Sequence, residues 1–212
     1  MCSFGYVLTD ESFNIIETDD IVMNPECEFD WYLFANKNDI KLAYPREHFR
    51  KQPNFTTFYE RIKKLATAEN RLVFGFSSLN DVGFVVTACE RYNLPRIDFA
   101  AYDLEKIIKK DEVIFGSLEK RCEILGCDNS DLQAHKSSDD AIMTMRLLKN
   151  FVQKENLSVS ELCQKNQQQC YSSKQFLKRR EQRAKKKARK ARFAESFSVN
   201  RRRKDSKTIR FD

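Results

Sequence analysis

Helix-like and strand-like segments alternate along residues 54–152, and this alternation decides the fold class of the chain. Residues 54–70 carry apolar side chains at spacings of three and four, which is typical of an amphipathic helix. A short apolar run follows at residues 71–76, then a second helical pattern at residues 82–92 and a second short run at residues 99–102. Short apolar runs between turn signals are typical of buried strands. The succession predicts an α/β domain.

Caps and turns mark the ends of the other predicted elements. Asn54 or Thr56 can cap the first of these helices, and Ser117 can cap a later helix that Gly126 ends. Near the N-terminus, two strand-like runs flank a polar turn at residues 10–12. This arrangement predicts a β-hairpin ahead of the alternating segments.

Charge divides the chain into a body and a tail. Residues 174–212 hold 17 Lys and Arg against 4 Asp and Glu, which gives a net charge of +13. Residues 1–173 hold 21 Lys and Arg against 27 Asp and Glu, which gives a net charge of −6. Such a division marks a boundary and indicates a polyanionic partner. We expect one domain over residues 1–157, a short helix and linker over residues 158–173, and then the basic tail. The tail has almost nothing to bury, so residues 174–192 are predicted to form a solvated helix and residues 195–212 to be disordered.

The cysteine pattern indicates reduced thiols. The cysteines are odd in number and lack CxxC spacing, and no Cys/His cluster has the spacing of a structural zinc site. No signal peptide and no apolar run of membrane-spanning length is predicted. We therefore expect a cytoplasmic protein without a membrane partner. The seven cysteines are Cys2, Cys27, Cys89, Cys122, Cys127, Cys163 and Cys170.

The motif with the clearest chemistry is H-x4-D, formed by His135 and Asp140 at the predicted start of a helix. A carboxylate in a first helical turn is favoured by the helix dipole and can hold a cation. A histidine on the preceding loop can reach the same space and accept a proton. The alternative is that Asp139 and Asp140 are ordinary first-turn acids and that His135 is an ordinary loop residue. Taken alone, these residues favour the alternative.

A second acid, Asp81, lies where a predicted strand turns into a helix. Ligands of open α/β sheets bind beyond the carboxyl ends of the strands, so Asp81 and Asp140 are expected to face one crevice. Carboxylates that converge there would bind Mg²⁺ or Mn²⁺, because these hard cations prefer oxygen ligands. Asp81 can also be a simple helix cap, and the two roles are compatible.

These segments together resemble the DEDDh exonuclease family, which includes the proofreading epsilon subunit of bacterial DNA polymerase III. Asn80 and Asp81 are similar to the second family motif, and the H-x4-D pair is similar to the third, in the same order. Residues 117–126 resemble the helix between them, and residues 3–25 resemble the second and third family strands. The resemblance covers about residues 3–152.

The resemblance implies a ribonuclease H-like fold, in which helices flank a mixed sheet of strand order 3-2-1-4-5. It implies two bound Mg²⁺ or Mn²⁺ ions, with Asp81 and Asp140 as metal ligands and His135 as the group that accepts a proton from the attacking water. The implied activity is 3′-5′ hydrolysis of DNA or RNA, preferentially at single-stranded 3′ ends.

The chain departs from the family pattern in its first motif. The family carries D-x-E on the first, central strand, which would precede Cys2, and that strand is expected to be missing here. The one D-x-E of this chain, Asp103 to Glu105, follows Asp81 and is rejected because of its order. Phe76 stands where many members have His. We therefore expect at most one weakly held ion and doubtful activity, either because the protein is longer or because the chain is a degenerate copy.

The basic tail supports a second hypothesis, a non-catalytic protein that binds nucleic acid. Lysines and arginines of the tail can contact phosphates and release counterions. The alternative is a solvated tail without a ligand, and aromatic residues for base stacking are few. The predicted phosphate contacts are Lys185, Lys186, Lys187, Arg189, Lys190, Arg201, Arg202 and Arg203.

Overall fold

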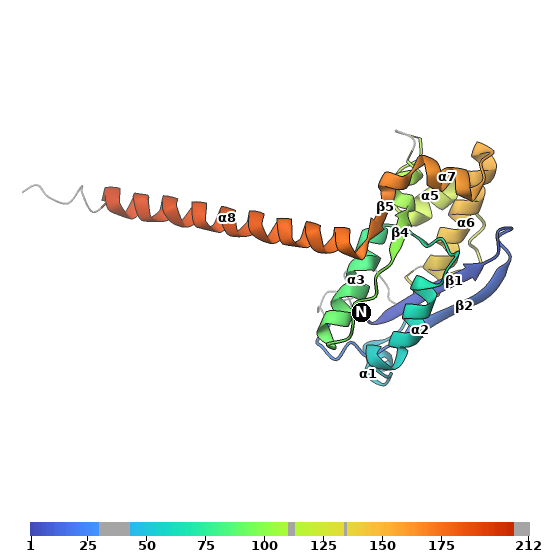
Figure 1. The fold of residues 1–212 in the computed structure, drawn as a ribbon, viewed down its shortest axis with the longest axis horizontal. Helices are drawn as coiled ribbons and strands as arrows, with labels where there is room; N and C mark the ends of the chain where they lie inside the picture. Colours follow the sequence, from blue (N-terminus) through green and yellow to red (C-terminus); the bar gives the residue numbers. More distant parts are fainter. Residues whose placement is uncertain (30–42, 110–112, 134, 206–212) are drawn as a thin grey trace, which may run out of the picture. The chain divides into compact units, whose positions relative to one another are not determined.

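The computed structural model describes residues 1–29, 43–109, 113–133 and 135–205 (Figure 1). The chain divides into two compact units, residues 1–173 and residues 174–212. Helices and strands alternate in the first unit, so the predicted α/β class is confirmed. The elements of this unit are β1 (Ser3–Thr9), β2 (Ile15–Val22), α1 (Arg46–Arg50), α2 (Phe55–Thr67), β3 (Phe74–Gly75), α3 (Ser78–Arg91), β4 (Ala100–Asp103), α4 (Leu104–Ile107), α5 (Leu118–Ile124), α6 (Ser137–Glu155), α7 (Val159–Lys165), the 3-10 turn η2 (Gln167–Gln169) and β5 (Cys170–Ser172).

The strands of the described residues form two separate sheets. β1 pairs with β2 as an antiparallel hairpin in which Ser3 lies opposite Val22. β3 pairs with β4 in parallel, and β4 pairs with β5 in antiparallel orientation. Within the described ranges, β2 is the only strand partner of β1, and β4 is the only strand partner of β3. The ribonuclease H-like strand order, which requires one sheet, therefore stays a prediction.

β3 is shorter than the strand predicted over residues 71–76. Its ladder covers Phe74 and Gly75, and the Tyr102 N–H donates to the Val73 carbonyl at 2.8 Å just ahead of it. Leu72 is 50% exposed. The start of the apolar run thus lies outside the core, which explains why the strand begins later than its composition indicates.

The hairpin packs against the N-terminal end of α6 at very close range. A Cβ atom on Gly5 would lie 1.9 Å from the carbonyl carbon of Ser137 and 2.2 Å from the amide nitrogen of Ser138. The hydroxyl groups of Ser3 and Ser137 are hydrogen-bonded at the same contact. β1 therefore fixes the position of the turn that carries His135.

Two clusters of buried apolar side chains hold the first unit together. One cluster joins the hairpin to α2 and α3, and the other joins α4, α5, α6 and α7. Burial of one such side chain contributes about 1.5–3 kcal/mol to folding. The first cluster contains Ile21, Met23, Phe55, Tyr59, Ile62, Val85, Ala88, Cys89 and Ile97. The second contains Leu104, Ile107, Ile108, Ile114, Cys122, Met143, Leu147, Leu148, Phe151, Val152 and Leu162.

The described residues of the second unit belong to a single long helix, α8 (Ser173–Asp205), seen as the orange and red ribbon of Figure 1. Every side chain from Lys178 to Ala191 is exposed, so this stretch gains no stability from burial. The helix extends beyond residue 192, where the predicted helical pattern ended, because the basic residues at positions 201–204 are themselves helix formers. No described helix is both long enough and apolar enough to cross a membrane.

Candidate functional site

Asp81 follows a tight turn that joins β3 to α3. Ser77 occupies this turn in the left-handed region, with φ 63° and ψ 39°, which is strained for a residue with a side chain. Its N–H donates to Oδ1 of Asp103 at 3.1 Å, and its hydroxyl donates to Oε2 of Glu105 at 2.5 Å. The turn is thus held by Asp103, at the end of β4, and by Glu105, in the helix α4 that follows; β4 is the parallel neighbour of β3.

The Asp81 carboxyl group lies in the first turn of α3, close to the end of β3. Its Oδ2 would be only 3.0 Å from a Cβ atom on Gly75, so this approach favours glycine at that position. Surrounding protein atoms and the negative charge of Asp103 raise the pKa of Asp81 to about 7. The residue is nevertheless exposed, so its carboxyl group is crowded by protein and still open to solvent.

Asp103 is a structural acid that the order of motifs had led us to set aside. It is 2% exposed, and its Oδ1 accepts hydrogen bonds from the Ser77 N–H and from the Glu105 N–H, both at 3.1 Å. Burial raises the pKa of Asp103, whereas the Ser77 hydroxyl lowers the pKa of Glu105. Sequence reasoning missed the proximity of Asp103 to Asp81, because it depends on the parallel pairing of β3 with β4, for which the sequence carries no local signal.

Phe76, which the sequence resemblance aligns with a histidine, packs under a buried arginine. The guanidinium carbon of Arg121 lies 5.0 Å from the centre of the Phe76 ring. Arg121 is 4% exposed and donates to the carbonyl oxygens of Gly116, Glu105 and Ile108 at 3.1, 2.7 and 2.8 Å. The ring is thereby part of the support for α5 and contributes no proton-transfer group.

His135 and Asp140 are brought together at the start of α6. The His135 N–H donates to Oδ1 of Asp140 at 3.2 Å, and His135 has a left-handed backbone with φ 64°. Burial raises the pKa of Asp140, the charges of Glu119 and Asp139 add to this effect, and the N–H and charge of His135 oppose it. His135 is exposed and Asp140 is half-buried. Both candidate turns therefore hold a non-glycine residue in a strained conformation, as functional sites often do.

The adjacent acid, Asp139, has a structural role. It accepts hydrogen bonds from the Gln133 N–H at 2.9 Å, from Lys136 Nζ at 3.0 Å and from the Ser138 hydroxyl at 2.9 Å. These contacts outweigh burial and lower the pKa of Asp139. In the part of the chain that the structure describes, the Asp140 carboxylate accepts only the His135 bond. Asp140 is thus the acid of the pair that remains available to a ligand.

The described acids of the two turns do not form a metal-binding group. The charged neighbour that raises the pKa of Asp81 is Asp103, on the strand adjacent to β3. Outside residues 30–42, 110–112, 134 and 206–212, no three His, Cys, Asp or Glu side chains group to hold a metal ion. Mg²⁺ needs several oxygen ligands in near-octahedral geometry. The described carboxylates therefore do not by themselves fit the two-metal centre that the resemblance implies.

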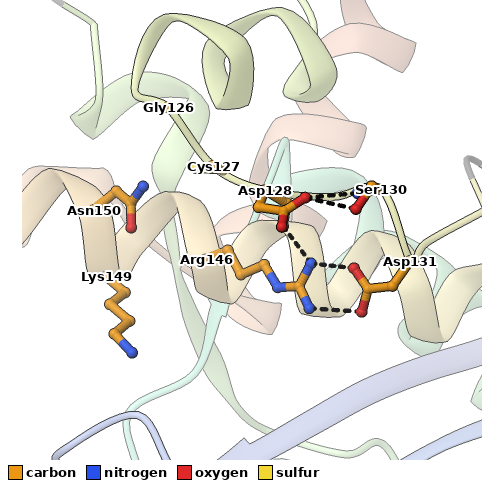
Figure 2. A pocket seen from close by; sticks show the side chains of 8 residues that line it. All are labelled: Gly126, Cys127, Asp128, Ser130, Asp131, Arg146, Lys149 and Asn150. Carbon is orange, nitrogen blue, oxygen red and sulfur yellow. Dashed lines mark hydrogen bonds and ion pairs between the residues drawn. The ribbon is translucent and has the colours of Figure 1, made fainter.

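A pocket beside the second half of α6 is lined by none of the predicted catalytic residues (Figure 2). Arg146 donates to both carboxylate oxygens of Asp131, at 2.6 and 2.8 Å, and also to the Asp128 carbonyl. Asn150 donates to the Leu125 carbonyl at 3.1 Å. These contacts fasten the α5–α6 loop to α6, so the pocket is explained by the structure of that loop.

The predicted phosphate contacts lie on α8. Lys185, Lys186, Lys187, Arg189 and Lys190 are exposed along its surface. The backbone of residues 201–203 continues the helix, and the side chains of these three arginines lie outside the described structure. No protein-family model, no curated protein and no solved structure matches this chain.

Proposed function

We propose that the chain binds nucleic acid through α8, and that its body is an exonuclease-like domain whose described residues do not complete a metal site. The observation that carries the proposal is the exposed basic surface of α8. Five of the six residues at positions 185–190 are Lys or Arg, and all are exposed. Charge of this density along one helix attracts a polyanion and accelerates its association.

The expected contacts are made with phosphates. Lysine and arginine contacts release the counterions that are condensed on a nucleic acid, so the affinity falls steeply as salt rises. Such contacts do not read sequence. The described side chains of α8 include two aromatic residues, Phe176 and Phe193, so base stacking contributes little.

Neutralising part of this surface tests the proposal. The triple variant Lys185→Gln, Lys186→Gln and Lys187→Gln should bind a labelled DNA oligonucleotide at least about tenfold more weakly, because each phosphate contact adds to the salt-dependent affinity. Fluorescence anisotropy of the full chain at one fixed salt concentration measures the loss.

The control variant removes the same charge from the body. The exposed residues Lys51, Lys64 and Lys109 are changed to Gln, and the affinity should then fall less than about threefold. Equal losses in the two triple variants would show that net charge alone governs binding and that α8 has no special part.

A second candidate function, 3′-5′ exonuclease activity, is supported by the contact between His135 and Asp140 and by the place of Asp81 at the end of β3. In the resembling family these residues would bind the metal ions and accept the proton of the attacking water. Among the described residues, the lack of a group of three His, Cys, Asp or Glu side chains weighs against this function.

A further inference from the structure

Asp20 of β2 lies between the hairpin and the start of α6. It is directly opposite Gly5 in the register of β1 and β2, so the two side-chain positions share one face of the hairpin. A Cβ atom on Gly5 would meet the backbone of Ser137 and Ser138, so this face is turned toward α6. Ser3 lies on the same face, and its hydroxyl group is hydrogen-bonded to that of Ser137. The Asp20 carboxyl group therefore belongs to the contact between the hairpin and α6.

Both carboxylate oxygens of Asp20 are buried without a hydrogen bond. The N-terminal end of a helix favours an anion, but within the described ranges no donor bonds to either oxygen, and this includes the N–H groups of the first turn of α6. Burial raises the pKa of Asp20, and the nearby Tyr44 hydroxyl and the charge of Lys136 only partly oppose it. Most buried polar groups have a partner. Asp139, across the contact, accepts three hydrogen bonds, so the two acids are treated very differently.

The charge of Asp20 decides how well the hairpin packs on α6. An ionised carboxylate without hydrogen bonds is costly to bury, and a neutral carboxylic acid is much less so. The negative charges of Asp19 and Asp139 add to this cost, and Lys136, which offsets part of it, is already paired with Asp139 at 3.0 Å. Opening of the contact returns both oxygens to water. The titratable groups around Asp20 are Cys2, Asp19, Tyr44, Lys136 and Asp139.

We propose that the protonation of Asp20 controls the contact between the hairpin and α6: the protonated acid packs against α6, and the ionised acid opens the contact and gives its proton to water. The pKa of Asp20 is raised in the packed state, so the contact is strongest at acid pH and weakens as the pH rises through that pKa. Ile21 and Met23 remain in the apolar cluster with α2 and α3, which confines the opening to the face toward α6. β1 positions the turn that carries His135, so this turn is released when the contact opens.

Hydrogen exchange of the full chain, measured by mass spectrometry, tests the proposal. Protection factors, which are corrected for the intrinsic effect of pH on exchange, are compared at pH 5 and pH 8 for residues 1–9 and 137–141. Protection in the unmodified chain should fall at least about tenfold, because each unit by which packing raises the Asp20 pKa is a factor of ten in the opening equilibrium.

Two variants of β2 separate Asp20 from its neighbour. Asp20→Asn keeps the shape of the side chain without its charge, and its protection should change less than about threefold between the two pH values. Asp19→Asn is the matched control, because Asp19 lies on the other face of β2, where it pairs with Arg61 at 2.8 Å. This variant should keep the pH dependence of the unmodified chain.

Three results would overturn the proposal. One is protection of the unmodified chain that stays constant or rises with pH, and this measurement needs no variant. Another is a loss of protection in Asp20→Asn as large as that in the unmodified chain. The third is an equal loss at residues 100–103 of β4, which belong to the other sheet, because the whole body would then lose stability without a specific part for this contact.

Discussion

Among the acids of the two candidate turns, Asp81 has the most strongly shifted pKa, and its environment explains the shift. The carboxyl group is crowded by protein atoms and is influenced by the negative charge of the buried Asp103. A negative charge is therefore unfavourable there, and its pKa rises from 3.8 to about 7. A cation bound beside Asp81 would instead stabilise the ionised carboxylate and lower its pKa.

The raised pKa predicts how stability depends on pH. Between about pH 4 and pH 7 the folded state keeps the Asp81 proton, whereas the unfolded state loses it, so the free energy of unfolding falls as the pH rises through this window. Asp81→Asn mimics the neutral acid and should be more stable than the unchanged protein at pH 8, with little difference at pH 4. Urea denaturation at both pH values measures this, and a difference that does not change with pH would contradict the assignment.

The residue contacts of the site could be predicted from sequence only where they are local. His135 and Asp140 are five residues apart at a helix start, so the pattern was enough to pair them, as the structure confirms. The proximity of Asp81 to Asp103 depends on the parallel pairing of β3 with β4, which joins residues more than twenty positions apart. No local pattern reports such a pairing.

At the scale of elements, the contact between β1 and the start of α6 determines where His135 lies. Gly5 allows this contact because it has no side chain, and even a methyl group would overlap the Ser137 backbone. The packing of one element against the other is thus decided at a single position.

Gly5→Ala should therefore destabilise the body by about 3 kcal/mol or more, because a rigid backbone would have to move to accept the methyl group. Gly126→Ala is the matched control: Gly126 has φ +67°, but open space surrounds the added atom. Its cost is limited to backbone strain, about 1–2 kcal/mol. Chemical denaturation measures the loss in free energy of unfolding for both variants. A smaller loss for Gly5→Ala than for Gly126→Ala would show that the contact between β1 and α6 is not tight.

Helices were predicted more fully than strands, for a physical reason. Asn54 and Ser117 were expected caps, and their side chains accept the N–H groups of Thr56 and Lys120. Caps and apolar stripes are properties of neighbouring residues, so a sequence displays them. Strand pairing is set by distant partners. β5 pairs with β4 although α6 and α7 lie between the two strands in the sequence, and for this reason β5 was not predicted.

At the scale of the whole molecule, chemistry and charge are divided between two units. The acidic residues of the candidate site belong to residues 1–173, and the exposed basic side chains of α8 belong to residues 174–212. A body with net charge −6 repels nucleic acid at long range, so the attraction comes from the tail, with net charge +13.

The division predicts weak or absent catalysis by this chain. Among the described residues, Asp81 and Asp140 belong to no group of three side chains that could hold a metal ion, and Mg²⁺ gives up its water reluctantly to so few ligands. Incubation of a 5′-labelled oligonucleotide with the full chain and Mg²⁺ or Mn²⁺ should show no 3′ shortening above that of the Asp81→Ala, Asp140→Ala double variant. Shortening that the double variant abolishes would establish an active enzyme and show that these carboxylates suffice.

The salt dependence of binding tests the central claim, that α8 is the nucleic-acid-binding part of the molecule. A DNA duplex with a single-stranded 3′ overhang is titrated with the full chain and with residues 1–173 alone, at several salt concentrations. Each phosphate contact contributes about 0.7–0.9 to the slope of log affinity against log salt. With the basic side chains of α8 in contact, the full chain should give a slope steeper by roughly 3 to 6 and a much higher affinity at low salt. Equal slopes for the two chains would contradict the claim.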